Sequence, residues 1–221
     1  MPVYQIVRLV VGDFRVNCWI VFSEGSGSSA PYCGVIDPGE DADLIVARLK
    51  TISLRPSHIL LTHGHFDHSA ALPDLRAAYP EASIAIHRAD APYLGPASLD
   101  LHRRSFSAAA GDSSYVDARW KAMPAADREL EEGDRIGPFT VLSLPGHSPG
   151  SAAFVLGDQN VIFSGDTLFR GNCGRVDLPG GDRREIEKSL KRLLALEGEI
   201  RVLPGHGEAT TVAAERGTRF F

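Results

Sequence analysis

The sequence predicts an α/β fold in a single domain spanning residues 1–221. Short apolar runs typical of strands alternate with longer segments whose apolar residues recur at helical spacing. The length of 221 residues suits one α/β domain, and the hydrophobic content of 43% suffices for a substantial core. A cluster of histidines also stands where a predicted strand gives way to a helix, a usual place for a site in α/β proteins.

Three strand-like runs at the start of the chain precede the first predicted helix. They span residues 3–11, 17–22 and 32–36, and the segment 23–31, rich in Gly and Ser, predicts a hairpin connection. Residues 41–53 then carry apolar side chains at positions 44, 45, 46, 49 and 52, which is the spacing of a helix.

The next predicted strand, residues 57–61, leads directly into the histidine cluster. A helix is predicted over 69–79, where Pro73 is acceptable only because it falls in the first turns. A short strand over 83–86 and a short helix over 88–96 follow.

Residues 97–126 have weak periodicity and many small residues, and we interpret them as a partly helical, lid-like insertion near the mouth of the site. The alternative that the sequence leaves open is a loop without a role. Within the insertion, we expect the side chains of His102, Arg103 and Arg104 to be solvated.

The rest of the chain is predicted to contain more strands and two helices. Residues 182–196 form an amphipathic helix, because Ile186, Leu190, Leu193 and Leu194 fall on one side. The predicted strands span 139–144, 151–156, 160–163 and 200–203, and a closing helix spans 208–216.

The cluster Thr62-His63-Gly64-His65-Phe66-Asp67-His68 is the strongest functional signal in the chain. Imidazole nitrogen and carboxylate oxygen are ligands that zinc and similar divalent ions accept. His63 and His65 point the same way in an extended segment and can converge on one ion. Asp67 and His68 project from the following turn in another direction, which favours two adjacent ions over one.

Three later strand ends each carry a ligand-type residue beside glycine, namely His147, Asp166 and His206. Glycine at such a position lets the backbone approach closely and turn sharply. Taken singly, each of these residues is more typical of a turn. Together with the cluster, they complete a set of ligands for two metal ions.

The motifs HGHFDH at 63–68, GHSPG at 146–150, SGDTLF at 164–169 and PGHG at 204–207 stand in this order. With them the chain resembles the metallo-β-lactamase superfamily over nearly its whole length. Within it, the chain is similar to the short glyoxalase II-like (hydroxyacylglutathione hydrolase-like) hydrolases. The resemblance implies an αββα four-layer sandwich, in which two mixed sheets are flanked by helices and the site lies at one edge of both sheets.

The resemblance also implies which residues hold which ion. The first metal would be held by His63, His65 and His147, the second by Asp67, His68 and His206, and Asp166 would bridge both. The implied ions are divalent, with zinc preferred, although iron and manganese suit the same ligands. A water bound between ions ~3.5–4 Å apart becomes a hydroxide nucleophile near neutral pH, and Asp67 is expected to orient it. The catalytic set is therefore Asp67, His63, His65, His147 and Asp166.

The activity that the resemblance implies is hydrolysis of a thioester, such as an S-2-hydroxyacylglutathione. Residues 168–177 are similar to a segment shared by the short glyoxalase II-like enzymes and by persulfide dioxygenases. In that segment, Phe169, Asn172 and Arg175 are the candidate substrate contacts, although Arg175 could instead pair with Asp177.

Other activities remain open at this point. They are a mononuclear iron persulfide dioxygenase, a hydrolase of another ester or lactone, and a non-enzymatic metal-binding relic. Asp166 disfavours β-lactam hydrolysis as the main activity, because classes of β-lactamase with a cysteine near this position use a different second site. The chain has 15 residues after His206, whereas longer glyoxalase II enzymes add a helical domain with glutathione contacts, so glutathione selectivity is open too.

Composition excludes several classes of partner. A net charge of −5 without a long basic run argues against nucleic-acid binding. No apolar stretch approaches the ~18 residues of a membrane span, and the N-terminus lacks the plan of a signal peptide. The three cysteines, Cys18, Cys33 and Cys173, imply no disulfide framework. We therefore expect a cytoplasmic protein with a small-molecule substrate, while its state as monomer or homodimer is open.

Overall fold

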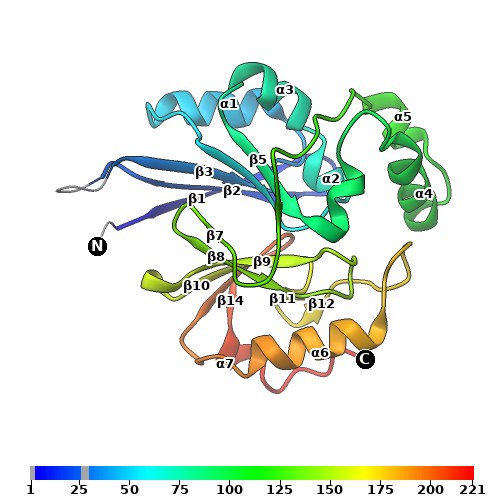
Figure 1. The fold of residues 1–221 in the computed structure, drawn as a ribbon. Helices are drawn as coiled ribbons and strands as arrows, with labels where there is room; N and C mark the ends of the chain where they lie inside the picture. The colour runs from blue at the N-terminus through cyan, green and yellow to red at the C-terminus, as the bar shows by residue number, and fades with distance from the viewer. Residues whose placement is uncertain (1–2, 26–29) are drawn as a thin grey trace.

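The structure is a computed structural model that describes residues 3–25 and 30–221. Its helices and strands form four layers, in the order helices, sheet, sheet, helices (Figure 1). This arrangement is the αββα sandwich with two mixed sheets, so the predicted fold class is confirmed. Residues 26–29 of the predicted hairpin connection lie outside the described residues.

The first sheet contains six strands in the order β1-β2-β3-β4-β5-β6. Their bounds are β1 Gln5–Val11, β2 Val16–Ser23, β3 Tyr32–Ile36, β4 His58–Leu61, β5 Ser83–His87 and β6 Arg128–Leu130. Strands β1 to β3 pair antiparallel, whereas β3 to β6 pair in parallel. Parallel pairs need crossover connections, and helices α1 (Ala42–Thr51) and α3 (Leu72–Ala78) supply two of them.

The second sheet also contains six strands, in the order β14-β13-β10-β9-β8-β7. Their bounds are β7 Arg135–Ile136, β8 Phe139–Ser143, β9 Ala152–Leu156, β10 Val161–Gly165, β13 Arg201–Pro204 and β14 Thr210–Thr211. Only β10 and β13 pair in parallel among these strands, across the helix α6 (Arg183–Leu194). A small hairpin, β11 (Leu168–Phe169) and β12 (Asn172–Cys173), follows β10.

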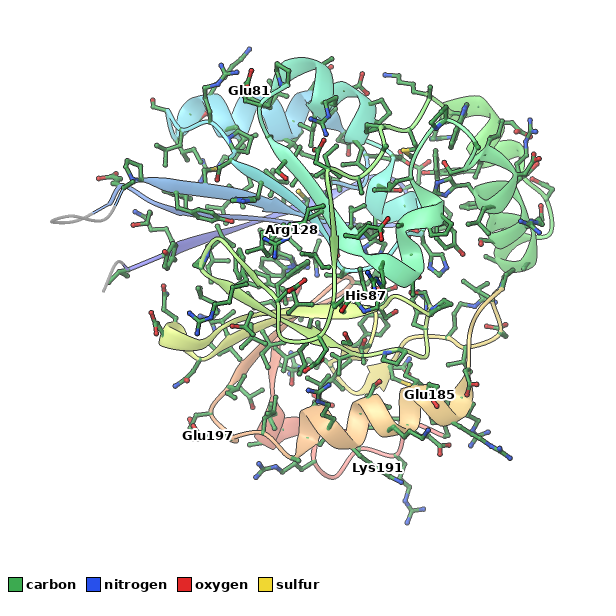
Figure 2. The ribbon with its side chains drawn as sticks, in the orientation of Figure 1. Glu81, His87, Arg128, Glu185, Lys191 and Glu197 are labelled. Carbon is green, nitrogen blue, oxygen red and sulfur yellow. The ribbon has the colours of Figure 1, made fainter. Side chains whose placement is uncertain are left out.

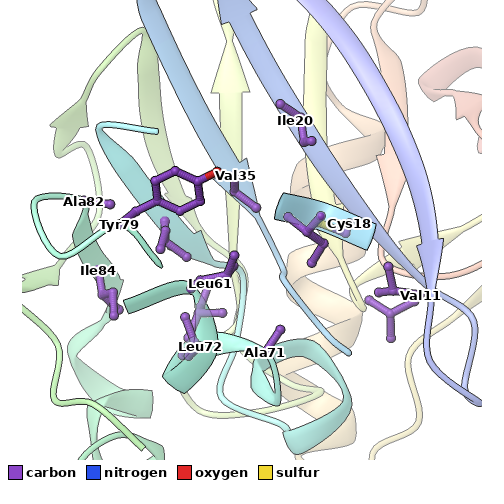
Figure 3. Packing of buried hydrophobic residues seen from close by; sticks show 14 of the residues in the cluster. Val11, Cys18, Ile20, Val35, Leu61, Ala71, Leu72, Tyr79, Ala82 and Ile84 are labelled. Carbon is purple, nitrogen blue, oxygen red and sulfur yellow. The ribbon is translucent and has the colours of Figure 1, made fainter. Parts of the chain in front are cut away.

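Apolar side chains fill the three interfaces between the layers. In β2, Cys18 belongs to the cluster under the helices of the first sheet, and Trp19 belongs to the cluster between the two sheets. A strand covered on both faces has to be apolar at successive positions, which explains the continuous apolar runs in the sequence. Figure 3 shows part of the first cluster, where Leu72 of α3 lies close to Leu61 of β4.

The outer helices are short and amphipathic. Asp182 caps α6, because its side chain accepts hydrogen bonds from the backbone N–H groups of Arg184 and Glu185 at 2.7 and 3.1 Å. Ile186 faces the second sheet, whereas Lys191 lies on the outer side of α6 (Figure 2). Among the helices of the described residues, none has the length and apolar character that crossing a bilayer demands.

Several short elements are absent from the sequence prediction. Strands β6, β7, β11 and β12 have two or three residues each, which is too short for a periodic pattern. The closing helix predicted over 208–216 is wrong in extent, because residues 210–211 form β14 and helix α7 spans only Val212–Glu215.

The insertion at 97–126 contains two helices, α4 (Leu99–Ala110) and α5 (Ser114–Arg119), which lie beside α2 (Phe66–Ser69) (Figure 1). Val116 and Met123 are buried in the same cluster as the core of the first sheet. Arg104 is exposed, as predicted, and Arg103 pairs with Asp117 at 2.6 Å. The insertion is therefore packed onto the fold, and a lid-like movement stays a prediction.

The expectation of a solvated His102 is wrong. Its side chain faces inward from α4, and the residue is 1% exposed. The ring packs 5.4 Å from that of Phe66 and 5.5 Å from that of Trp120. Its Nε2–H donates to the backbone carbonyl of Tyr93 at 2.8 Å. Burial lowers the pKa of His102 to about 4, so the ring is neutral at physiological pH.

Candidate metal centre

The predicted ligands gather where strands of both sheets end. Four of them follow β4: His63 and His65 lie in the connection to α2, and Asp67 and His68 lie in α2 itself. Asp166 follows β10, and His206 follows β13, the parallel neighbour of β10. His147 lies in the loop between β8 and β9. The carboxyl ends of parallel strands meet at one edge of a sheet, and the two sheets present these edges to each other.

The first group consists of His63, His65 and His147. Each offers a nitrogen, and these atoms lie within 4.8 Å of one another. Within this group, His65 Nδ1 lies 2.9 Å from His147 Nε2. All three side chains are buried.

The second group consists of Asp67, His68 and His206, whose ligand atoms also lie within 4.8 Å of one another. His68 Nε2 is 3.2 Å from His206 Nε2, and His206 Nε2 is 3.5 Å from Asp67 Oδ2. Here His68 is fully buried, whereas Asp67 and His206 are partly exposed.

Asp166 lies between the two groups. Its Oδ1 is 3.4 Å from His68 Nε2, and its Oδ2 is 3.5 Å from His206 Nε2 and 3.7 Å from His147 Nε2. The carboxylate can therefore serve both groups at once. The structure thus brings together all seven predicted residues, and their role as ligands stays a prediction.

The chemistry of these atoms fits divalent metal ions. His63 Nε2, His65 Nε2 and Asp166 Oδ1 are buried and have no hydrogen-bond partner within residues 3–25 and 30–221. A buried polar atom without a partner costs about 1–3 kcal/mol, so three in one place call for a bound cation. Three ligand atoms per group, with a carboxylate between the groups, suit two ions.

In the first group, the surroundings of His63 and His65 favour the neutral form of both imidazoles. Burial, together with the neighbouring His147, lowers the pKa of His65 to about 3. Burial and the nearby His68 hold the pKa of His63 well below its ordinary value. Neutral imidazoles have a free lone pair, which is the form that a metal ion takes.

The carboxylates of the centre stay ionised. Burial acts to raise the pKa of Asp67, but His68 and a hydrogen bond from His206 outweigh it and hold the pKa at about 2. Burial also acts to raise the pKa of Asp166, but His68 and His206 outweigh it and hold the pKa well below its ordinary value. Both carboxylates therefore carry negative charge for a cation.

Asp37 orients the second group and was missed in the sequence analysis. This buried carboxylate accepts from the backbone N–H and the hydroxyl of Thr62, both at 2.7 Å. Its Oδ2 also lies 3.1 Å from His68 Nδ1, which leaves His68 Nε2 to face Asp166. A carboxylate directly after the predicted strand 32–36 is the signal that could have identified it.

Asp90 joins the two loops of the first group and was also missed. It is 0% exposed, and its Oδ2 accepts from the N–H of Gly64 at 2.8 Å and from the hydroxyl of Ser148 at 2.7 Å. Its Oδ1 accepts from the N–H of Gly150 at 2.7 Å. Gly64 lies between two predicted ligands, and Ser148 follows a third. No pattern in the sequence indicates this contact.

A cavity of about 380 Å³ opens beside the centre. Asp67, Asp166 and His206 lie on its wall, so a molecule in the cavity reaches the predicted ligands. Phe169 and Arg175 also line it. Arg175 pairs with Asp177 through two hydrogen bonds of 2.7 and 2.8 Å, as the alternative reading of the sequence expected.

Asn172 does not belong to the cavity wall among the described residues. Its side-chain oxygen accepts from the N–H of Cys173 at 2.8 Å. Phe14, in the turn between β1 and β2, does line the cavity, and its carbonyl accepts from His206 Nδ1 at 3.0 Å. This turn therefore orients one predicted ligand and supplies an aromatic ring to the cavity.

The family model of the metallo-beta-lactamase superfamily matches residues 11–206, and the chain belongs to this superfamily. Hydroxyacylglutathione hydrolase GloC of Haemophilus influenzae is 30% identical over 218 residues, which cover 98% of this chain and 97% of the relative.

Two solved structures are similar over nearly the whole chain. TTHA1623 in a di-iron-bound form is 39% identical, with a TM-score of 0.78 and coverage of 96% of this chain and 98% of that one. BLEG-1 B3 metallo-beta-lactamase is 31% identical, with a TM-score of 0.80 and coverage of 96% of both chains.

Proposed function

We propose that this member of the superfamily is a binuclear metallohydrolase that cleaves a thioester, such as an S-2-hydroxyacylglutathione. The observation that carries the proposal is the pair of three-residue ligand groups joined by Asp166 on the wall of a cavity. The identity of 30% to the Haemophilus influenzae hydroxyacylglutathione hydrolase supports a thioester as the substrate class.

The chain's own residues would prepare the reaction. When bound, two divalent ions would acidify a water molecule and polarise the substrate carbonyl. Asp67 stays ionised and lines the cavity, so its carboxylate can accept a hydrogen bond from the attacking water and orient it. Asp37 and Asp90 hold the loops in place, so the ligands need little reorganisation.

The leaving group of a thioester simplifies the chemistry. A thiol with a pKa of ~8.5 departs as a thiolate without the help of an acid. Cys173 lines the cavity, but burial raises the pKa of its thiol, so it stays protonated and is a poor nucleophile. The proposed mechanism therefore assigns the attack to water.

The experiment is metal analysis combined with a substrate panel. The purified protein should carry about two divalent ions per chain, for which we propose zinc, and should release thiol from S-lactoylglutathione. A chelator should abolish the activity, and added metal should restore it. Iron must be measured too, because the similar structure of TTHA1623 is a di-iron-bound form.

Other results would contradict the proposal in distinct ways. One iron per chain with oxygen consumption on glutathione persulfide would identify a dioxygenase. Hydrolysis of a lactone, a simple ester or a β-lactam without thioester hydrolysis would change the substrate class. A metal-loaded protein inert on the whole panel would be a binding relic of the fold.

We also propose that the protein acts in the cytoplasm on a small molecule, with neither nucleic acid nor membrane as a partner. Its three cysteines form no disulfide in the structure of residues 3–25 and 30–221, which supports a reducing compartment. Fractionation of cells expressing a tagged protein checks this placement.

A further inference from the structure

Part of the cavity wall, formed by α4 and by the turn between β1 and β2, is apolar. Helix α4 supplies Phe106, Ala109 and Ala110 to it, and the turn between β1 and β2 supplies Phe14. The rings of Phe14 and Phe106 pack edge to face at 5.4 Å, so the two segments form one surface. Phe14 is 43% exposed, so part of its ring is open to a molecule in the cavity that it lines.

His102 Nδ1 has no hydrogen-bond partner among the described residues but is buried away from solvent, and the other polar groups on this wall are paired. The hydroxyl of Ser105 lies 2.9 Å from that of Tyr93, and His102 Nε2 donates to the carbonyl of Tyr93. Arg175, the one cationic side chain besides histidine among the described residues that line the cavity, is neutralised by Asp177. The wall therefore offers no free partner for a charged or strongly polar group.

We infer that the acyl group of the substrate is apolar and bulky, and that it lies against α4. The inference rests on the proposed thioester hydrolysis and names the acyl group that this site prefers. The carbonyl carbon has to lie beside Asp67 and Asp166, which line the same cavity. The substituent of the acyl group then points to Phe106 and Ala109, whose contact removes apolar surface from water.

The carrier thiol remains at the mouth of the cavity. A glutathione carrier brings two carboxylates and an ammonium group, and leaving these unpaired against an apolar wall is costly. A thiol carrier at the mouth can also diffuse away as soon as the C–S bond breaks. Water supplies the hydroxyl to the acid product, and the thiolate takes up the remaining proton from solvent.

The test compares S-mandeloylglutathione with S-lactoylglutathione, which share the carrier and the 2-hydroxyl group and differ in a phenyl ring against a methyl group. We expect kcat/KM to be at least about tenfold higher for the mandeloyl ester, which corresponds to about 1.4 kcal/mol. In Ala109→Asp, a charge enters the wall, and kcat/KM for the mandeloyl ester should fall about tenfold more than that for the lactoyl ester.

Ala108→Asp is the matched control. Ala108 is exposed in the same last turn of α4 but does not line the cavity among the described residues, so both variants share the cost of an acidic residue near a helix C-terminus. The control should keep the wild-type preference. Ala110→Asp repeats the test at a second position that lines the cavity. Metal content and thermal unfolding verify that each variant is folded.

Three results would overturn the inference. Equal or faster hydrolysis of the lactoyl ester would refute it and leave the thioesterase proposal intact. A wild-type preference for the mandeloyl ester in both Ala109→Asp and Ala110→Asp would also refute the inference and leave the thioesterase proposal intact. Failure to hydrolyse either ester would refute the thioesterase proposal and the inference together.

Discussion

At the scale of single residues, two buried carboxylates outside the predicted ligand set hold the loops of the centre in place. Asp37 holds Thr62 and His68, and Asp90 holds Gly64, Ser148 and Gly150. Each ties loops from separate parts of the chain at the points where ligands leave them. Outer partners of this kind fix the orientation of metal ligands, and their loss typically lowers metal affinity 10–100-fold.

Asp90→Asn should lower metal affinity by about 10–100-fold. An amide has one acceptor oxygen, so the N–H of either Gly64 or Gly150 would face an NH₂ group, which leaves a buried donor unpaired. Competition with a chromophoric chelator measures the affinity. Asp43→Asn, at an exposed position on α1, is the control and should bind metal as the wild type does. Wild-type affinity in Asp90→Asn would refute the role.

His102 should make stability depend on pH. Its pKa is about 4 in the folded chain and about 6.5 when unfolded, so the unfolded state takes up the proton first as the pH falls. The stabilisation is complete above pH 6.5 and is lost as the pH falls to 4, with a total of about 3 kcal/mol. The free energy of unfolding of His102→Gln should be flatter than that of the wild type across this range. Parallel curves would contradict the prediction.

Functional residues could be predicted where they lie close together in the sequence. Four of the seven predicted ligands could be read from the sequence because a close pattern of metal-binding side chains rarely arises without a site. His147, Asp166 and His206 were predicted only together with this cluster, from their place beside glycine at strand ends and from the order of the family motifs. Asp37 and Asp90 could not be predicted, because a carboxylate that accepts from backbone N–H groups across 25 to 60 positions leaves no local pattern. His102 was wrongly predicted to be solvated, because its burial depends on the packing of α4 against Phe66, which the sequence does not indicate.

At the scale of elements, the centre depends on tight turns after strands. Gly205 lies between β13 and His206, and a Cβ there would overlap Asp166 Oδ1 and approach His68 Cε1 to 2.7 Å. Only the missing side chain of glycine lets this turn lie against two predicted ligands.

Gly205→Ala should therefore displace Asp166 or His68 and reduce the bound metal to well below two ions per chain. Elemental analysis after gel filtration measures the ratio. Gly157→Ala is the matched control, because a Cβ at this distant turn meets no atom within 4 Å, and it should retain the full metal content. Equal metal content in both variants would show that the turn tolerates a side chain.

Helices and strands could be predicted where they are long enough to show a periodic apolar pattern. Strands 32–36 and 83–86 and the helix at 182–196 emerge within one or two residues of their predicted ends. The insertion was ambiguous, because nine of the twelve residues of α4 are Ser, Ala or polar and its apolar face covers a cavity as well as the core. The insertion looks like a loop only in the composition of its exposed residues. The buried side chains of Val116 and Met123 anchor it to the core.

At the scale of the whole molecule, the two sheets are joined by apolar packing over their facing surfaces and by the ligand set at their shared edge. The continuous apolar runs of β2 and β4 are typical of strands covered on both faces, but they do not indicate which layer covers which face. That information comes from long-range pairing, for which a single sequence carries no signal. The resemblance to a known family supplied the four-layer order.

His68 and His206 are 138 positions apart, and the same metal ion would hold both. Such an ion would act as a removable cross-link between positions 68 and 206, and closing so long a loop would strongly restrict the unfolded ensemble. The supply of metal in the cell would then affect the lifetime of the protein as well as its turnover number. Under metal starvation, the pool of enzyme would shrink by proteolysis, and recovery would need new synthesis in addition to fresh metal.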